Sequence, residues 1–499
     1  MKGGHDSASH GSNASEKFDE SFGTFVKKYH QRTAQSRQFM ERSQKVHADK
    51  SSIAFGASPD TQPLTYPIVV DHAKGSRLVD IDGNEYIDVL QGLGANLFGH
   101  HPDFVRDAIA AQVEKGFPIG VQMELVEKVA RQVTTLTGMP RVCFSNTGTE
   151  AVMTAIRVAR GKTGKDMIAV FADSYHGHSD TVLMRASMAA FIRKRLRQRF
   201  ANRKWLAPLA RWIGPGQITA APASIGIPRN IAKDMMVLEY GNPRSLEMIH
   251  AKRHRLAAVL VEPVQSRCPE LQPREFLHSL REVTASSQVA LIFDEMVTGF
   301  RVHPGGAQGY FGIESDLATY SKIVGGGLPL SVIAGRECFM NMLQPTDPQV
   351  PVSKTTFFAG TFCKHPLALA ASYATLKRIT DEGPALQEGL NQKTGLMVQR
   401  LNNMTANEGF PVRFTHFGSF FSMALSQSKI APAAINRLSY DLLYNGIFLR
   451  GGDRGGFLTT SHSDQDIDTI VETWIRGLRR LAQSGHLACD IENRTPNKA

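Results

Sequence analysis

The chain has few cysteines and no long apolar run. Its five cysteines among 499 residues are odd in number, scattered and without CxxC spacing. This pattern fits neither a disulfide framework nor a zinc site, and it favours the reducing cytoplasm. No run of about 18 apolar residues occurs, so we expect no membrane span. Residues 1–20 are polar and lack the apolar core of a secretory signal, so we expect a disordered tail there.

The rest of the composition is that of a globular enzyme. Apolar residues make up 42% of the chain and charged residues 21%, so a sizeable core can form. The length is too great for one small domain. It suits a large α/β catalytic domain with smaller appendages.

The charge excess is concentrated in one segment. The net charge is +11, and eight basic residues without an acid lie between Ala190 and Ile213. Apolar residues at helical spacing predict a basic amphipathic helix there. This helix could be a solvated surface helix or a docking face for an acidic protein. It could also contact nucleic acid or an anionic membrane. Since no nucleic-acid module accompanies it, we expect no nucleic-acid partner. The basic residues are Arg193, Lys194, Arg195, Arg197, Arg199, Arg203, Lys204 and Arg211; the apolar ones are Ile192, Leu196 and Phe200.

Helical and β-rich stretches alternate between Met123 and Val297, which predicts a mostly parallel sheet covered by helices. Short strands are expected around the turns Lys74-Gly75 and Asp82-Gly83. Later helices are expected at Pro366–Arg378, at Leu386–Leu401 and after Ser463, with Asp466 at the third position. We therefore expect a tail and helical arm at 1–47, with the arm lying on a partner subunit. A small domain is expected from 48–110 and 366–485, and a tail at 486–499. The large domain is expected at 111–365, with a basic insert at 190–213.

One lysine stands out in the segment Asp316–Arg336. Lys322 follows a short apolar-polar run and precedes three glycines, Gly325–Gly327. An enzyme that forms a Schiff base needs an amine in a confined pocket, with chain beside it that can approach a bulky aldehyde closely. Many surface loops share this pattern, so the lysine gains weight only from its surroundings.

Two acids follow strongly apolar strands. Asp294 ends the run ALIF, and Glu262 follows AAVLV. A buried carboxylate needs a cationic partner, and a protonated pyridine nitrogen is one. A helix cap or a salt bridge would equally explain Asp294.

Hydroxyl and aromatic residues complete a candidate cofactor site. Thr147, Gly148 and Thr149 lead into a helix whose amino end suits a phosphate ester, although an ordinary cap would look the same. Tyr175 follows a strand and could stack on a planar ring or belong to the core, while His176 shapes the turn. Lysine, acid and phosphate cradle together indicate pyridoxal phosphate.

The chain resembles the class III (ω) aminotransferases, a fold-type I family that includes ornithine aminotransferase and glutamate-1-semialdehyde aminomutase. The resemblance covers about residues 65 to 480. It rests on LVDIDGNEYIDVL, FGHHPDFV, FSNTGTEAVMTAIRVAR, SYHGHSD, VEPVQ, IFDEMVTGFR, YSKIVGGGLPLSVIAGR, GTFCKHPLALAA and LTTSHSDQDID.

The resemblance implies a large α/β domain, a smaller α+β domain from both ends of the chain, and a homodimer with shared active sites. It also implies roles for individual residues. Lys322 would carry pyridoxal 5'-phosphate and shuttle a proton, Asp294 would pair with the ring nitrogen, and Tyr175 and Met296 would lie on the two ring faces. Gly148 and Thr149 would hold the phosphate with Thr361 of the second subunit, and Glu262 would lie near the ring hydroxyl. We expect no metal.

Two positions depart from the family pattern, and the second bears on the substrate. Thr147 replaces the usual serine of the phosphate motif, and His365 replaces the usual asparagine of GTFxxNP. The second variant resembles the aminotransferase domains of hybrid polyketide–nonribosomal peptide synthases. Those domains aminate a β-keto acyl chain on an acidic carrier protein, which the basic insert could dock.

The expected activity is transfer of an amino group from an amino-acid donor to a ketone or aldehyde acceptor. Arg301, Arg450 and Arg454 are candidates for binding the donor carboxylate, and Arg301 could also be structural. A 2,1-aminomutase would use the same residues. A catalytically silent binding protein is a third possibility, against which the intact site residues count.

Overall fold

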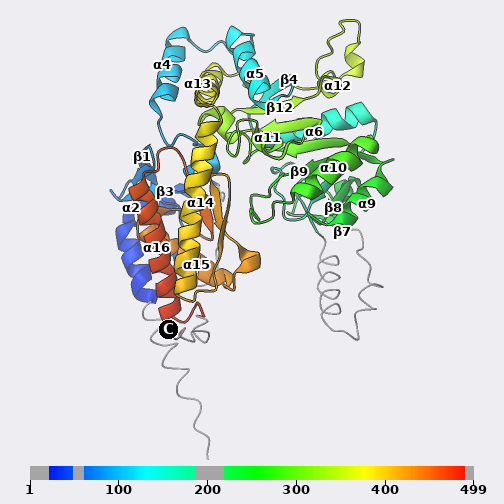
Figure 1. Cartoon of the computed structure of the whole chain (residues 1–499). Helices are drawn as coiled ribbons and strands as arrows, with labels where there is room; N and C mark the ends of the chain where they lie inside the picture. The colour runs from blue at the N-terminus through cyan, green and yellow to red at the C-terminus, as the bar shows by residue number, and fades with distance from the viewer. Residues whose placement is uncertain (1–21, 49–60, 187–217, 489–499) are drawn as a thin grey trace, which may run out of the picture. The chain divides into compact units, whose positions relative to one another are not determined.

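The computed structural model describes residues 22–48, 61–186 and 218–488 (Figure 1). The predicted basic helix at 190–213 and both predicted tails lie largely or wholly outside these residues. The chain divides into two compact units: Met1–Pro102 with Gln392–Ala499, and Asp103–Asn391. In the described part, no helix is long and apolar enough to cross a bilayer.

The first unit combines segments from both ends of the chain. Its four-stranded sheet has the order β1-β2-β3-β15, and its three-stranded sheet the order β13-β14-β16. The elements are α2 (Ala34–Ser43), β1 (Val70–Lys74), β2 (Arg77–Asp80), β3 (Glu85–Asp88), α3 (Gln91–Gly94), β13 (Phe414–Phe417), β14 (Phe420–Met423), α15 (Pro432–Tyr444), β15 (Ile447–Phe448), β16 (Gly455–Phe457) and α16 (Asp464–Gln483).

Local sequence signals in this unit are confirmed. Ser463 caps α16 and forms a capping box with Asp466, as expected. Residues 22–32 are helical, but their apolar positions pack on their own chain: Phe25 lies 5.5 Å from Tyr444 between ring centroids. The arm was expected to lie on a partner subunit. Within the described chain the Phe25 ring packs on α15, and the contact of the arm with a partner subunit stays a prediction.

The second unit is built on a nine-stranded sheet, order β4-β12-β11-β10-β9-β5-β8-β7-β6 (Figure 1). Strands β11, β10, β9, β5 and β8 are mutually parallel, whereas β12, β7 and β6 run antiparallel to their neighbours. The strands are β4 (Arg141–Ser145), β5 (Met167–Phe171), β6 (Met184–Ala186), β7 (Ile218–Pro222), β8 (Met235–Leu238), β9 (Leu256–Val261), β10 (Ala290–Asp294), β11 (Leu317–Tyr320) and β12 (Ser331–Gly335).

Helices cover both faces of this sheet, which confirms the expected architecture. Val170 belongs to the buried cluster that includes residues of α6, whereas Phe171 lies 5.7 Å from Phe276 of α10 between ring centroids. Successive strand residues point to opposite faces, so α6 and α10 lie on opposite sides. The helices are α4 (Asp103–Lys115), α5 (Glu124–Thr137), α6 (Gly148–Thr163), α9 (Pro243–Lys252), α10 (Arg274–Ser286), α11 (Gly306–Phe311), α12 (Glu337–Met340) and α13 (Pro366–Glu382).

The boundaries of the two units differ from those of the expected domains. We expected the large domain to end at residue 365, but the second unit continues to Asn391 because α13 packs against α4 and α5. The next helix, α14 (Pro384–Asn407), crosses from the second unit into the first.

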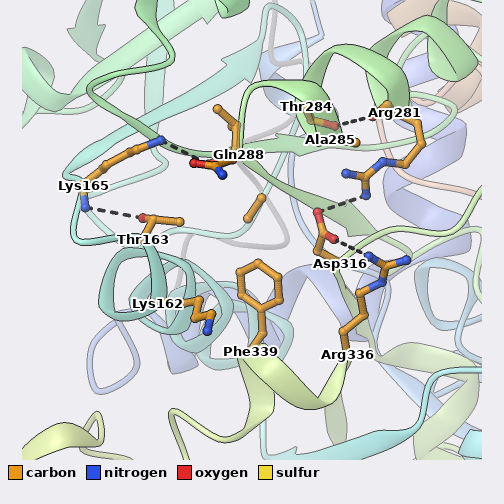
Figure 2. Close-up of a pocket in the computed structure, with 12 residues that line it drawn as sticks. Lys162, Thr163, Lys165, Arg281, Thr284, Ala285, Gln288, Asp316, Arg336 and Phe339 are labelled. Carbon is orange, nitrogen blue, oxygen red and sulfur yellow. Dashed lines mark hydrogen bonds and ion pairs between the residues drawn. The ribbon is translucent and has the colours of Figure 1, made fainter.

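A carboxylate ties the amino edge of the sheet together (Figure 2). Asp316 is 5% exposed and accepts hydrogen bonds from the Leu291 amide at 2.8 Å and the Arg281 guanidinium at 3.0 Å. Arg336 approaches its other oxygen at 3.5 Å. Asp316 and both arginines line a cavity of about 400 Å³, whose walls come from α6, α10, α12 and the chain at the starts of β10 and β11. Because two arginines already face Asp316, we interpret the cluster as a structural brace.

The brace predicts a large stability effect. Asp316→Ala should lower the free energy of unfolding by about 3 kcal/mol, because it removes a buried carboxylate that accepts from a backbone amide and faces two guanidinium groups. Urea unfolding followed by circular dichroism measures the change. Glu314→Gln is the control: its side chain is 88% exposed and pairs with Arg336 at 3.6 Å, so it should cost about 0.5 kcal/mol or less. Equal effects of the two substitutions would contradict the brace.

Candidate active site

The predicted site residues gather at the carboxyl edge of the nine-stranded sheet. Asp294 ends β10, Glu262 directly follows β9, and Tyr175 lies four residues after β5. These three strands are adjacent and parallel, so their carboxyl ends meet at one edge. The edge lies opposite the Asp316 brace.

Asp294 is held by a histidine. The His176 Nδ1 lies 2.6 Å from Asp294 Oδ2, and the two residues are 4% and 2% exposed. The Met296 amide donates to the other carboxylate oxygen at 3.2 Å. His176 was predicted only to shape a turn and contact the cofactor. The structure adds a contact that fixes the Asp294 carboxylate.

Glu262 joins two loops at this edge. One oxygen accepts from the Tyr175 amide at 2.9 Å, and the other from the amide and hydroxyl of Ser266 at 3.2 and 2.9 Å. Burial raises the pKa of Glu262, the Asp294 carboxylate raises it further, and His176 opposes the change. Glu262 therefore has a structural role in addition to its position near the site.

Lys322 follows β11 in a strained conformation. Its φ of 55° lies in the left-handed region, which costs a residue with a side chain free energy. The residue is partly exposed, yet desolvation lowers the pKa of its amine; Asp294 and Glu262 oppose this shift, and Arg301 adds to it. Lysine and both carboxylates thus belong to one electrostatic cluster, and the amine loses its proton more readily than an ordinary lysine does.

One glycine after Lys322, Gly326, serves packing. A Cβ on Gly326, whose φ is 59°, would lie 2.6 Å from Thr375 Oγ1 and 2.7 Å from the Ala371 carbonyl oxygen. Both contacts are with α13, so only glycine fits. We had explained the glycines by close approach to a cofactor, but at Gly326 the close approach is to a helix.

The amino end of α6 lies beside the same loops. Thr147 caps the helix by accepting from the Glu150 amide at 3.3 Å. Among the described residues, the amides of Gly148 and Thr149 have no acceptor. A Cβ on Gly148 would lie 2.8 Å from the Met296 sulfur, which places these predicted residues side by side.

The turn after Tyr175 closes over Thr149. A Cβ on Gly177 would lie 2.6 Å from Thr149 Oγ1, and the His178 amide donates to the same oxygen at 3.3 Å. The ring of Tyr175 itself is 48% exposed. The start of α6 and the loop after β5 therefore form one wall.

Other predicted residues lie elsewhere. Thr361 is exposed in a turn beside Asn146, whose amide nitrogen lies 3.7 Å from the Cys363 sulfur. Nothing in the described residues places Thr361 against the Lys322 cluster.

Arg301 is 0% exposed, and burial lowers its pKa to about 9, so it is not presented to an incoming carboxylate. Arg450, which binds Asp453 at 3.0 Å, and Arg454 belong to the first unit.

These groups fit the parts of pyridoxal phosphate. An aldehyde needs an amine that is readily deprotonated, and Lys322 offers one. A phosphate suits the two amides of α6 that have no acceptor in the described residues. A protonated ring nitrogen suits a buried carboxylate, and Asp294 is held in place for it. A buried imidazole nitrogen without a hydrogen-bond partner in the described chain, His176 Nε2, also marks the site as polar.

The contact between the loop after β9 and the loop after β5 was not predicted from the sequence. The Gln265 side chain donates to the Ala172 carbonyl at 2.7 Å and to the Ser174 hydroxyl at 2.8 Å, which locks the loop after β9 onto the loop after β5. Arg267 on this loop lies over the Tyr175 ring, 5.8 Å from its centroid. The signal that the sequence offered for Arg267 was its position five residues after Glu262.

Comparison with known proteins shows the family that this chain resembles over most of its length. Residues 58–455 match a family model described as aminotransferase class III. A relative from Desulfitobacterium hafniense named glutamate-1-semialdehyde 2,1-aminomutase is 34% identical over 421 residues, covering 81% of this chain and 89% of the relative. An omega-transaminase structure from Sphaerobacter thermophilus has a TM-score of 0.75 at 25% identity, covering 89% of this chain and 97% of that one. A structure described as a transaminase with PLP bound has a TM-score of 0.76 at 26% identity, covering 91% and 99%.

The pair of His176 and Asp294 predicts a stability difference between two variants. His176→Ala should destabilise the ligand-free protein by about 3 kcal/mol, because the buried Asp294 carboxylate loses its histidine partner. His176→Asn keeps a nitrogen donor and should retain most of that stability. Thermal unfolding followed by circular dichroism compares them. If the alanine variant were as stable as the asparagine variant, the hydrogen bond would not hold Asp294.

Proposed function

Since this chain belongs to the class III aminotransferases, which are fold-type I enzymes dependent on pyridoxal 5'-phosphate, we propose that it moves an amino group from an amino-acid donor to a ketone or aldehyde acceptor. The observation that carries the proposal is that Lys322 follows β11 at the same carboxyl edge as the buried carboxylates Asp294 and Glu262, and that both carboxylates act electrostatically on its amine. A lysine in such surroundings suits covalent and acid–base chemistry.

Bound pyridoxal phosphate supplies an aldehyde that takes up the amino group and a ring that withdraws electrons from the donor carbon. Lys322 would be the attachment point. Once displaced by the donor, its Nζ would remove the proton from the donor carbon and deliver it again nearby. The lowered pKa of Lys322 supports this role, because only the neutral amine can accept a proton.

Asp294 would face the ring nitrogen, and its contacts with His176 and the Met296 amide support a fixed orientation. The two free amides at the start of α6 would hold the phosphate, with the Thr147 and Thr149 hydroxyls nearby. Tyr175 would lie on one face of the ring and Met296 on the other, with Glu262 near the ring hydroxyl.

The acceptor is proposed from the resemblance in the sequence. A β-keto acyl chain or an aldehyde of secondary-metabolite biosynthesis, free or on an acidic carrier protein, fits the GTFCKHP variant around His365 and the basic insert at 190–213. A cytoplasmic location is part of the same proposal. None of the four described cysteines is in a disulfide bond, as a reducing compartment favours.

A 2,1-aminomutase is the second candidate. The observation in its favour is that curated relatives at 31–34% identity carry the name glutamate-1-semialdehyde 2,1-aminomutase. That reaction moves the amino group within one molecule, so it needs no separate donor and acceptor.

Isotope transfer tests the function. The holoenzyme should move ¹⁵N from labelled L-glutamate to a medium-chain β-keto thioester, offered free and on a carrier protein, with the amino product detected by mass spectrometry. Lys322→Ala should slow transfer by roughly 10⁴-fold or more, because Nζ is both the attachment point and the proton carrier.

Lys165→Ala is the matched control. Burial also lowers the pKa of Lys165, but this lysine lies at the amino edge, so transfer should continue. Product from glutamate-1-semialdehyde alone, with no ¹⁵N transfer, would favour the aminomutase. No amine chemistry with any substrate would indicate a silent binding protein. Equal rates on free and carrier-bound thioesters would remove the carrier from the proposal.

Class III aminotransferases are typically dimers, and an exposed aromatic patch supports a homodimer here. Phe117, Val121, Phe357 and Phe362 are 48%, 51%, 79% and 56% exposed. The rings of Phe117 and Phe362 lie 6.1 and 6.3 Å from that of His365. Monomers rarely expose such a patch. Thr361 is exposed and directly precedes Phe362, which supports the proposal that it reaches the second subunit's site.

The patch predicts the oligomeric state. The wild type should sediment as a dimer, whereas Phe357→Asp with Phe362→Asp should shift it toward the monomer and lower activity, because charges would be buried at the interface. Ile225→Asp is the control, since Ile225 is 99% exposed outside the patch. A wild-type monomer with full activity would refute the shared site.

A further inference from the structure

The cavity beside Asp316, at the amino edge of the sheet, is lined by an excess of positive charge (Figure 2). Asp316 is the one carboxylate among the residues that line it, and it faces four cationic side chains. These are Lys162, Lys165, Arg281 and Arg336. Because the lining carries more positive than negative charge, the cavity attracts anions.

Two of the four cations are already engaged by the walls. Lys165 donates to the Gln288 carbonyl at 3.1 Å. Arg281 donates to the Asp316 carboxylate at 3.0 Å and to the Glu314 carbonyl at 3.2 Å. These two side chains therefore hold the walls together.

The other two cations, Lys162 and Arg336, have little compensation. Arg336 approaches Asp316 at 3.5 Å and Glu314 at 3.6 Å, which are long contacts for charged groups. A guanidinium has five N–H donors, so these contacts leave donors for a ligand. Within the described part of the chain, Lys162 forms no hydrogen bond or ion pair, and Figure 2 shows none to it. Both side chains can therefore bind an anion.

The inside of the cavity is apolar. Val289 and Ala290 are each 2% exposed, whereas Lys162 and Arg336 are exposed and mark the mouth. In the view of Figure 2, the partly buried ring of Phe339 lies between these two cations. A water molecule takes about 30 Å³ in the liquid, so the cavity has more room than a bare phosphate ion needs. The lining suits an anion that carries an apolar ring.

We propose that this cavity is a binding site for a small phosphomonoester with a planar ring. The phosphate lies at the mouth, where Lys162 and Arg336 bind it, and the ring lies inside against Phe339. A phosphate ester has three strong acceptor oxygens and a charge of about −1.5 to −2 at pH 7, which matches two cations. A guanidinium binds phosphate through two parallel hydrogen bonds, and aromatic rings favour offset stacking. The site lies at the opposite edge from Lys322 and does not depend on the proposed function.

Calorimetry on the holoenzyme tests the site, with phenyl phosphate and inorganic phosphate as probes. The holoenzyme is used because its cofactor occupies the other expected phosphate site. Phenyl phosphate should bind more tightly than inorganic phosphate by about fivefold or more, because its ring adds apolar contact. Lys162→Gln and Arg336→Gln should each weaken phenyl phosphate binding about tenfold, because each removes a charged donor. Phe339→Leu should reduce the preference for phenyl phosphate over inorganic phosphate.

Arg253→Gln is the matched control. Arg253 is exposed and lies just before β9, at the same edge of the sheet but outside the cavity lining. Its substitution changes the net charge by the same amount and should leave phenyl phosphate binding unchanged. Circular dichroism checks that each variant is folded. Because Lys162 is exposed, Lys162→Gln should keep the fold even if Arg336→Gln weakens it.

Three results would overturn the proposal. The wild-type holoenzyme could bind no phenyl phosphate at millimolar concentration, or bind it no more tightly than inorganic phosphate. Lys162→Gln and Arg336→Gln could bind phenyl phosphate as tightly as Arg253→Gln does. Phenyl phosphate could also shift the absorbance of the bound cofactor and do so equally in both variants, which would place it at the active site.

Discussion

The second unit buries charged groups at one edge of its nine-stranded sheet, and the arrangement of the loops at that edge depends on compensating them. Asp294 and Glu262 are almost fully buried, and the partly buried amine of Lys322 lies in the same electrostatic cluster. An isolated buried charge costs several kcal/mol, so each group needs compensation. His176 provides it for Asp294, and the Tyr175 and Ser266 groups provide it for Glu262. The loops that carry these partners are consequently held in place, and with them the walls of the site.

The amino edge of the sheet serves stability, and the carboxyl edge serves chemistry. At the amino edge, Asp316 is satisfied by a backbone amide and faces two arginines, which suits a structural tie between β10 and β11. At the carboxyl edge, the lysine is strained, with a φ of 55°, and its amine is easily deprotonated. Strain of this kind persists where surrounding structure enforces it and commonly marks functional positions. Both edges carry charged clusters, and the strained backbone and lowered amine pKa of Lys322 distinguish the carboxyl edge.

Patterns with a local cause could be predicted from the sequence. The alternation of apolar strands and amphipathic helices predicted the parallel sheet, and the Ser463 cap predicted the start of α16, because both depend on neighbouring residues. The position of Asp294 at a strand end predicted its place at the carboxyl edge. The pairing of His176 with Asp294 spans 118 residues, so no local pattern reveals it. Arg267 was missed for the same reason, since its contact with Tyr175 depends on how two loops meet.

The central claim is that the Lys322 amine is the reactive group of this site. Borohydride reduction of the wild-type holoenzyme, followed by peptide mass mapping, tests it most directly, because reduction makes the link between lysine and cofactor permanent. The account predicts that the added mass lies on the peptide that contains Lys322 and on no other lysine. A label on a different lysine, such as Lys165 or Lys364, or none after full loading with pyridoxal phosphate, would contradict it.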